Sequence, residues 1–525
     1  MLRGGAGGGR PLTEMRAASF LLGALLAMTA DMAAAREIAG SPVSVTLPAG
    51  ALAGRAQGGV DAFVGIPYAA PPVGPLRWRP PAPAPRWDGA RQAVRFGNDC
   101  PQVRYPGDAT PSDQAMSEDC LVLNVWRPTG AARSRLPIMV WIHGGAFVAG
   151  SSASPVLDGA ALARRGVILV SFNYRLGRFG FFAHPALTRE ADGHPDANFA
   201  FLDMIAALRW VRDNCAALGG DPGNVTIFGE SAGGAAVGFL MASPEARGLF
   251  HKAALMSGAG RQPYARLDTD RPSRISAHMA GVGFAVGAGL VEPDPAALRA
   301  LPTDKVSGGL AFYDLQPLSF TGPVIDGRTM LDDPDRRFAA GEVPAIPFIV
   351  GSTSAELSEE SFAGIMMDLI RAQQSRDGMA ILERAYGDPP ARALIDDYFF
   401  TEAARGYARM MARRAPTWRY VFDHVAEAER GRRHGANHAS ELAYLFGNLP
   451  ANAGPTDRET ARLMGDYWIN FARTGDPNGA GLPAWPRQGR GDPLLLFGAT
   501  GASVERNRNT ARLDAVERAM AARPR

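Results

Sequence analysis

Ser231 lies in the stretch "TIFGESAGGAAV" (226–237), between two glycines in the pattern G-x-S-x-G. This pattern is typical of a nucleophilic serine on a sharp turn from a strand to a helix, where small neighbours let the two elements pack closely. The chain contains 61 glycines, so the five residues alone also fit a chance match. Their surroundings favour the catalytic interpretation, because residues 224–228 are typical of a strand and residues 231–242 of a helix.

A nucleophilic serine also requires a base, an orienting acid and backbone N–H groups that bind the developing oxyanion. The stretch "WIHGGAF" (141–147) ends a continuous apolar run in glycines, which let the main chain approach a substrate oxygen closely. We expect an oxyanion hole made of the N–H groups of Gly144, Gly145, Ala146 and Ala232. The alternative interpretation of residues 143–146 is a plain turn at the end of a strand.

Eight histidines are candidates for the base, and two of them, His434 and His438, share the stretch "RRHGANHASELAYLF" (432–446). Histidines four residues apart could also bind a metal ion on one face of a helix. Gly435 and Asn437 disfavour a helix at this place, and the chain has no H-E-x-x-H motif. The sequence therefore predicts no metal site.

The elements that must position these residues alternate between strand and helix. Amphipathic spacing predicts a helix over 198–220, and a second helix follows Ser231. Apolar runs predict strands at 136–147, 166–174, 224–228, 250–258 and 346–352. This alternation indicates an α/β fold with a large, central, mostly parallel twisted sheet flanked by helices on both faces. Ligands gather at the carboxyl ends of strands in such sheets, which is where Ser231 is expected.

The N-terminus has the features of a signal peptide. Three arginines precede the apolar stretch "AASFLLGALLAMTA" (17–30), which is too short to span a membrane, and an A-x-A cleavage site follows at 33–35. We expect residues 1–35 to be a signal peptide and residues 36–525 a single domain that is exported, either periplasmic or secreted. An uncleaved anchor or a disordered tail is the alternative, and Met15 is a second possible start.

Cysteine usage fits an oxidising compartment. Cys100 and Cys120 enclose a polar segment of 19 residues, whereas Cys215 lies in a helical pattern. We expect a disulfide between Cys100 and Cys120 and a free, buried Cys215. The alternative is three unpaired thiols.

Charge and glycine patterns argue against two other classes of protein. The formal net charge of the 525 residues is +3, without a run of Lys and Arg, so no surface for nucleic acid is predicted. The stretch "GVGFAVGAG" (281–289) departs from G-x-G-x-x-G at Val286 and no strand precedes it, so nucleotide binding is not predicted either. The expected partner is a small molecule, and the sequence leaves the oligomeric state open.

Between residues 63 and 478 the sequence resembles the type-B carboxylesterase and cholinesterase family of α/β-hydrolases. The matching segments occur in the family's order: "FVGIPYAAPPVGPLRW" (63–78), "SEDCLVLNVW" (117–126), "WIHGGAF", "FNYRLGRFGFF" (172–182), "LGGDPGNVTIFGESAGG" (218–234), "PVIDG" (323–327), "HASELAYLFG" (438–447) and "YWINFARTGDPN" (467–478). The resemblance implies the α/β-hydrolase fold, hydrolysis of a carboxylic ester to an acid and an alcohol through an acyl-enzyme, and no cofactor.

The resemblance also selects the base and the acid. The family's H-x-x-E-L-x-Y pattern matches at His438, and its glutamate, five residues after a glycine, matches at Glu356 in "VGSTSAEL" (350–357). Around that glutamate the family usually has Asp and Gly, whereas this chain has Ala355 and Leu357, and Glu359 and Glu360 are competing acids. The implied triad is Ser231, Glu356 and His438, in the chain order of α/β-hydrolases. Glu230 either tunes the electrostatic field of this site or acts as a supporting acid.

The resemblance indicates the class of substrate less precisely than it indicates the catalytic residues. It implies that choline binding uses a tryptophan in the first disulfide loop, and the only aromatic residue between 101 and 119 is Tyr105. We therefore expect an esterase for uncharged or mildly acidic esters, with carbamates or the polycarboxylate esters of fungal toxins as alternatives. A binding module of the same fold that has lost catalysis is less consistent with the three retained residues. The acyl and alcohol pockets are expected from Phe147, Val148 and residues 310–320 and 358–415.

Overall fold

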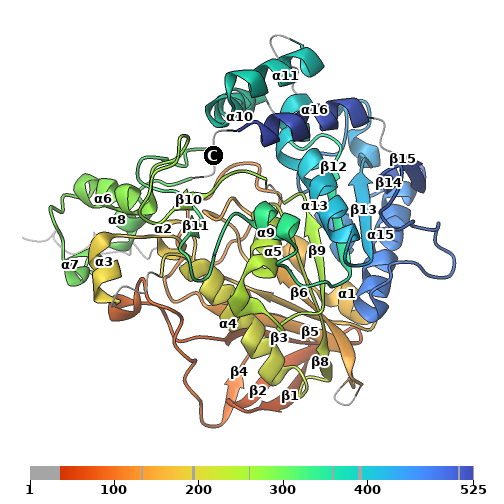
Figure 1. Ribbon diagram of the computed structural model, residues 1–525. Helices are drawn as coiled ribbons and strands as arrows, with labels where there is room; N and C mark the ends of the chain where they lie inside the picture. The colour runs from red at the N-terminus through yellow and green to blue at the C-terminus, as the bar shows by residue number, and fades with distance from the viewer. Residues whose placement is uncertain are drawn as a thin grey trace, which may run out of the picture.

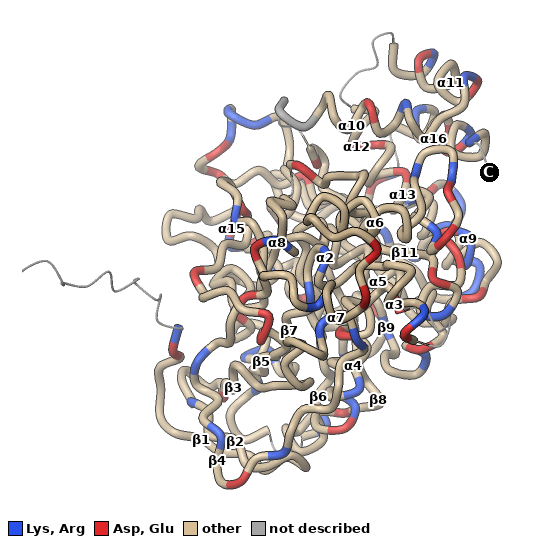
Figure 2. The backbone as a smooth tube through the Cα atoms, turned by 90° about the vertical axis from the view of Figure 1, so that its left-hand side faces the viewer, with Lys and Arg blue, Asp and Glu red and all other residues tan. Residues whose placement is uncertain are grey.

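The computed structural model describes residues 36–523, except 132–133, 192–195, 259–260, 312, 358–359, 388–392 and 507–508. The expected signal peptide, residues 1–35, lies outside the described residues. Among the described residues, no helix has the length and hydropathy that a membrane crossing requires. Basic and acidic residues are interspersed over the side of the molecule that Figure 2 shows.

One large sheet runs through the described chain, and its strand order is β1-β2-β3-β5-β7-β6-β8-β9-β12-β13-β14-β15, with β4 paired to β2. In this order, the strands β7-β6-β8-β9-β12-β13-β14 pair with one another in parallel, whereas β5 pairs with β7 and β15 with β14 in the antiparallel direction. The bounds are β1 Ser41–Leu47, β2 Gly50–Gln57, β3 Val60–Pro67, β4 Ala90–Gln92, β5 Val122–Pro128, β6 Leu136–Ile142, β7 Ile168–Phe172, β8 Gly220–Glu230, β9 Lys252–Met256, β12 Phe348–Thr353, β13 Thr417–Phe422, β14 Pro493–Gly498 and β15 Gly501–Arg506; β10 (Ala265–Arg266) and β11 (Val324–Ile325) pair separately. The predicted α/β class with a mostly parallel sheet is confirmed.

Helices cover both faces of this sheet (Figure 1). They are α1 Ala160–Arg164, α2 Gly177–Gly180, α3 Pro185–Glu190, α4 Phe199–Asn214, α5 Ala232–Ala242, α6 Ala277–Gly287, α7 Pro295–Arg299, α8 Thr303–Ser307, α9 Pro334–Ala340, α10 Glu360–Gln373, α11 Arg376–Tyr386, α12 Ala393–Asp396, α13 Glu402–Ala412, α14 Leu442–Phe446, α15 Pro455–Thr474 and α16 Thr510–Ala521. In Figure 1, α10, α11 and α16 group together at one end of the molecule.

Strand β6 shows why the apolar runs are continuous. Its alternate residues point to opposite faces, so Val140 and Ile142 join one core cluster while Met139 and Trp141 join another. The first cluster packs under α4, α5, α9 and α13, and the second under α1, α14 and α15. A strand with helices on both sides must be apolar on both sides.

The predicted elements occur with shifted ends. The helix expected over 198–220 is α4, which ends at Asn214 because the chain turns there and Gly220 N–H bonds back to the carbonyl of Cys215. Strand β8 begins at Gly220, four residues before the predicted start, where it pairs with Leu136 of β6.

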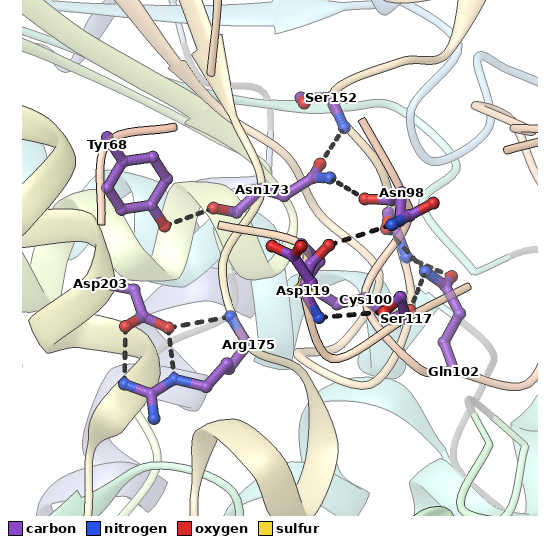
Figure 3. Close-up of a disulfide and its surroundings, with 12 residues drawn as sticks. Tyr68, Asn98, Cys100, Gln102, Ser117, Asp119, Ser152, Asn173, Arg175 and Asp203 are labelled. Atoms are coloured by element: carbon purple, nitrogen blue, oxygen red, sulfur yellow. Dashed lines mark hydrogen bonds and ion pairs between the residues drawn. A yellow bond between two sulfur atoms is a disulfide. The ribbon is translucent and has the colours of Figure 1, made fainter. Parts of the chain in front are cut away.

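The predicted disulfide between Cys100 and Cys120 is present, with a Cα–Cα distance of 5.1 Å, and the alternative of three unpaired thiols is wrong (Figure 3). Cys215 is free and buried, as predicted. Asn98 lies beside the bridge and donates to the carbonyl of Asp119 at 3.2 Å. The bridge thus closes the segment 101–119, here called the disulfide loop.

Replacing both Cys100 and Cys120 with alanine should lower the free energy of unfolding by about 3 kcal/mol, because the unfolded chain regains the entropy of the open loop. Thermal and urea unfolding of the two proteins measures the difference. A reducing agent should bring the wild-type protein to the stability of the variant and leave the variant unchanged. Equal stability of the two oxidised proteins would contradict this expectation.

Candidate active site

Ser231 occupies the turn between β8 and α5. Its φ of +56° and ψ of −124° lie in a region that side-chain-bearing residues rarely adopt, which is a strained conformation. The glycines around it permit close packing, because a Cβ on Gly233 would lie 2.0 Å from the carbonyl oxygen of Ile142 in β6. A Cβ on Gly229 would lie 2.5 Å from the carbonyl carbon of Gly233. The structure therefore contains the strand, sharp turn and helix that the sequence pattern predicts.

The loop after β6 lies against this turn. A Cβ on Gly144 would be 3.0 Å from the Cβ of Ser231 and 2.9 Å from the carbonyl oxygen of Glu230. Gly145 and Ala146 have positive φ values of +97° and +52°, which turn the loop sharply. Within the described part of the chain, no backbone acceptor takes the N–H groups of the four expected oxyanion donors, Gly144, Gly145, Ala146 and Ala232.

Replacing Gly144 with alanine should lower kcat about 100-fold, because the added methyl group would press on Ser231 and displace a donor N–H group. Steady-state kinetics on p-nitrophenyl acetate measures the loss. Gly287→Ala at the end of α6 is the matched control, since its added Cβ would meet no atom within 4 Å. Wild-type kcat in the Gly144 variant would contradict the expected position of this loop.

Glu356 and His438 meet beside this loop. Glu356 follows β12, and its Oε2 lies 2.5 Å from Nδ1 of His438. Its Oε1 accepts the N–H of Thr353 at 2.8 Å, and the side chain is buried. The two segments also exchange backbone hydrogen bonds: Ala355 N–H donates to the carbonyl of Ala436, and His438 N–H to that of Glu356, each at 3.0 Å. Acid and base are therefore fixed to each other by main chain and side chain.

The competing candidates are placed differently. His434 is exposed, four residues from His438. Glu359 lies outside the described residues, and Glu360 begins α10. Among the described residues, no group of three or more His, Cys, Asp or Glu side chains is arranged to hold a metal ion.

The second ring nitrogen of His438 contacts another acid. Nε2 lies 3.2 Å from Oε1 of Glu230, the residue before Ser231. Within the described residues, no hydrogen bond joins Ser231 Oγ to His438. The ring of Phe400 packs against the imidazole with a centroid distance of 5.1 Å. In this structure, therefore, the imidazole lies between two carboxylates.

Burial and mutual repulsion shift the ionisation of this cluster. Burial raises the pKa of Glu230 to about 7, partly opposed by His438. Burial alone would lower the pKa of His438, but the carboxylates of Glu230 and Glu356 outweigh it and raise that pKa to about 10. Burial and the other two acids also raise the pKa of Glu441, which is buried three residues after His438. Protons in this cluster are thus shared among one imidazole and several acids.

A cavity of about 530 Å³ opens over the site, and Gly144, Gly145, Ser231, Glu356 and His438 all line it. Residues 105–110 of the disulfide loop form one wall, and parts of the segment 424–457 form another. The expected pocket residues Phe147 and Val148 do not line this cavity. Phe147 is buried instead in an aromatic cluster with Phe181, Phe201 and Phe239.

The rest of the expected pocket lies at most at the edge of this cavity. None of the described residues of 310–320 lines the cavity, and region 358–415 approaches it through the contact of Phe400 with His438. The wall formed by the disulfide loop was missed, although the predicted bridge was the signal that could have indicated an ordered loop.

The sequence analysis did not single out His424, a buried histidine near the site, because no motif marks it. His424 Nε2 lies 2.7 Å from Asp457 Oδ1, and the hydroxyl of Tyr444 donates to the same oxygen at 3.0 Å. Tyr444 belongs to α14, which follows the His438 segment directly. This network ties the segment that carries His438 to the start of α15.

Comparisons with known proteins show which proteins this chain is similar to as a whole. The sequence model of the "Carboxylesterase family" matches residues 41–386 and 388–516. Fumonisin B1 esterase of Sphingopyxis macrogoltabida is 36% identical over 476 residues, which cover 86% of this chain and 85% of that protein. Para-nitrobenzyl esterase of Bacillus subtilis (strain 168) is 36% identical over 475 residues, covering 84% and 92%. A solved PNB esterase structure superposes with a TM-score of 0.75 at 32% identity and covers 90% of this chain and 99% of that one.

Proposed function

The chain belongs to the carboxylesterase family of the α/β-hydrolases, whose members are serine esterases, and from this premise we propose that Ser231, Glu356 and His438 form its catalytic triad. The 2.5 Å contact between His438 and the buried Glu356, in the cavity that Ser231 also lines, carries the proposal. An orienting acid, an imidazole and a strained serine in one cavity are the parts that acyl transfer requires.

The proposed reaction begins when Ser231 Oγ attacks the ester carbonyl and His438 Nε2 takes the hydroxyl proton. Glu356 holds the imidazole tautomer through Nδ1 and stabilises the imidazolium ion. The N–H groups of Gly144, Gly145, Ala146 and Ala232 bind the oxyanion of the tetrahedral intermediate. His438 then protonates the leaving alcohol. In the second half of the reaction, His438 takes a proton from water, the water attacks the acyl-enzyme, and His438 returns the proton to Ser231 as the acid leaves.

Labelling with a radioactive organophosphate tests this proposal against a binding module of the same fold. We expect one equivalent of phosphoryl group per chain, located on the Ser231 peptide, together with the loss of p-nitrophenyl acetate hydrolysis. Full labelling of another residue, or ester hydrolysis that survives complete labelling, would reject Ser231 as the nucleophile.

Glu230 adds a pH dependence to the proposed mechanism. His438 accepts the serine proton only when Nε2 is unprotonated, so kcat/KM rises as the pH rises through the pKa of His438. Glu230→Gln removes a negative charge 3.2 Å from Nε2 and lowers that pKa, because the imidazolium loses a favourable neighbour. We therefore expect the acidic limb of the kcat/KM profile to move to lower pH by about 1 unit or more.

The profile is measured from about pH 5 to about pH 10 for both proteins. Glu429→Gln is the matched control, because Glu429 also lines the cavity but pairs with Arg433 at 3.3 Å. Its acidic limb should coincide with that of the wild-type protein. An unmoved limb in the Glu230 variant would mean that this carboxylate does not control the base.

Uncharged esters are the proposed substrate class. Among the described residues, five carboxylic acids line the cavity, Asp108, Glu230, Glu356, Glu429 and Asp457, whereas Arg433 is the only Lys or Arg residue that does so. This balance disfavours a substrate with several carboxylates. The alternative, a carbamate- or polycarboxylate-specific and toxin-degrading esterase, draws support from Arg433 and from the similarity to fumonisin B1 esterase. A panel of p-nitrophenyl esters of rising acyl length, a carbamate and a tricarboxylate ester separates these possibilities by kcat/KM.

Export is part of the proposal as well. The disulfide between Cys100 and Cys120 supports an oxidising compartment, and residues 1–35 have the composition of a signal peptide. Expression of the full chain in a bacterium, followed by cell fractionation and N-terminal sequencing, tests it. Periplasmic or secreted protein that begins near Arg36 is the expected result, whereas cytoplasmic protein with an intact N-terminus would contradict it.

A further inference from the structure

Gln102, two residues after Cys100, forms hydrogen bonds through both ends of its side-chain amide (Figure 3). Its Nε2 donates to the carbonyl of Gly150 at 2.9 Å, and the N–H of Gly150 donates to its Oε1 at 2.9 Å. Nε2 also donates to the carbonyl of Cys100 at 3.1 Å. The amide therefore pairs with Gly150 in the way that a peptide of a neighbouring strand would.

Gly150 closes the loop that carries the proposed oxyanion donors. Its φ is +118°, and a Cβ there would lie 2.3 Å from Nδ1 of His143 and 2.6 Å from the carbonyl oxygen of Gly144. The main chain of Gly150 therefore packs directly on His143 and Gly144. Gly144 in turn lies against Ser231, as the 3.0 Å distance of its added Cβ shows. A short chain of direct contacts thus joins Gln102 to the nucleophile.

The other end of this chain of contacts is anchored in the core. The disulfide fixes Cys100, and Asn173, at the end of β7, donates to the carbonyl of Asn98 at 2.9 Å. Asn173 also accepts the N–H of Ser152, just after Gly150, at 2.8 Å (Figure 3). Gln102 is therefore held on one side by the disulfide loop, which is anchored at Cys100, and on the other side by its hydrogen bonds to Gly150.

We propose that Gln102 is a positioning residue for the oxyanion hole: its amide holds Gly150, and through it Gly144 and Gly145, at the distance from Ser231 that the transition state requires. The role needs a donor and an acceptor on one planar group, which glutamine provides. It rests on the proposed function, because it assumes that these glycines bind an oxyanion. Positioning groups of this kind affect the rate more than substrate binding.

The test compares Gln102→Ala with the wild-type protein on p-nitrophenyl acetate. We expect kcat to fall about 10-fold with little change in KM. An aryl trifluoromethyl ketone, which forms an oxyanion adduct with a serine, should lose affinity by the same factor, since it resembles the transition state. Gln114→Ala is the matched control, because Gln114 lies in the same disulfide loop but accepts from Arg36 N–H at 3.2 Å. Its kcat and its affinity for the ketone should equal those of the wild-type protein.

Gln102→Glu adds a readout that a purely structural role would not change. The carboxylate accepts from Gly150 N–H but cannot donate to the Gly150 carbonyl until it is protonated. The ratio of the variant's kcat to wild-type kcat should therefore rise as the pH falls toward the range in which a glutamate protonates.

Three results would overturn the positioning role: unchanged kcat and ketone affinity in Gln102→Ala, equal losses in Gln114→Ala, or a kcat ratio for Gln102→Glu that does not depend on pH. Each of these three results can be interpreted only if the wild-type protein hydrolyses the ester and binds the ketone. A wild-type protein that does neither would instead refute the proposed function. Melting temperatures of all variants identify any loss that comes from unfolding.

Discussion

Replacing Ser231 with alanine is expected to lower kcat for ester hydrolysis by roughly 10⁵- to 10⁶-fold, because the variant lacks the hydroxyl that forms the acyl-enzyme in the proposed mechanism. The loss should fall on kcat rather than on KM, since the serine hydroxyl contributes to bond formation more than to binding. The strained backbone at residue 231 is set by the neighbouring glycines and by the hydrogen bond from its N–H to the carbonyl of Met256 at 3.0 Å. The alanine variant should therefore fold as the wild-type protein does.

The measurement is single-turnover and steady-state hydrolysis of p-nitrophenyl acetate, with the melting temperature as the control for folding. Ser257→Ala is the control variant, because this serine is buried next to the site and donates to Glu441 at 3.5 Å but is not part of the proposed triad. It should retain most of its activity. A kcat in the Ser231 variant within about 100-fold of the wild-type value would remove the basis of the proposed mechanism.

Replacing Glu356 with glutamine is expected to lower kcat by about 10⁴-fold while leaving the fold intact. The amide has nearly the shape of the carboxylate and can still accept the N–H of Thr353. It can also donate to Nδ1 of His438, which would place the imidazole proton on Nε2, where it blocks the uptake of the serine proton. The negative charge that stabilises the imidazolium ion is lost at the same time.

The same experiment decides between the acids in this segment. Glu359→Gln is the matched control, since it changes a carboxylate three residues away. It should retain wild-type kcat if Glu356 is the orienting acid. A large loss in the Glu359 variant together with a small loss in the Glu356 variant would reverse the assignment.

The sequence predicted those parts of the site that depend on backbone shape. Glycines at 229 and 233 are required by the close approach of α5 to β6, so the pattern around Ser231, with a strand before it and a helix after it, indicates the geometry of this turn. The apolar runs of β6 and β8 encode burial on both faces, which predicts a central place in the sheet. Both features are local consequences of residue type.

Other parts depended on contacts between distant residues, which residue types do not encode. Glu356 and His438 are 82 positions apart, and their selection came from resemblance to a family rather than from a local pattern. The contact of Glu230 with His438 Nε2 depends on the orientations of two side chains. The cavity wall formed by residues 105–110 depends on how the disulfide loop folds back over the sheet. The place of Phe147 outside the cavity has a related reason. This residue follows the oxyanion glycines, but the positive φ values at 146 and 147 turn its ring into the core.

The paired backbone hydrogen bonds between the segments around Ala355 and His438 have a further consequence for local stability. Two segments that share main-chain hydrogen bonds and a 2.5 Å side-chain contact open together in one cooperative fluctuation. Amide hydrogens at Ala355 and His438 should therefore exchange with solvent at a common rate set by that opening. Brief local unfolding would remove the acid and the base at once, so the population of molecules with only one of the two in place stays small.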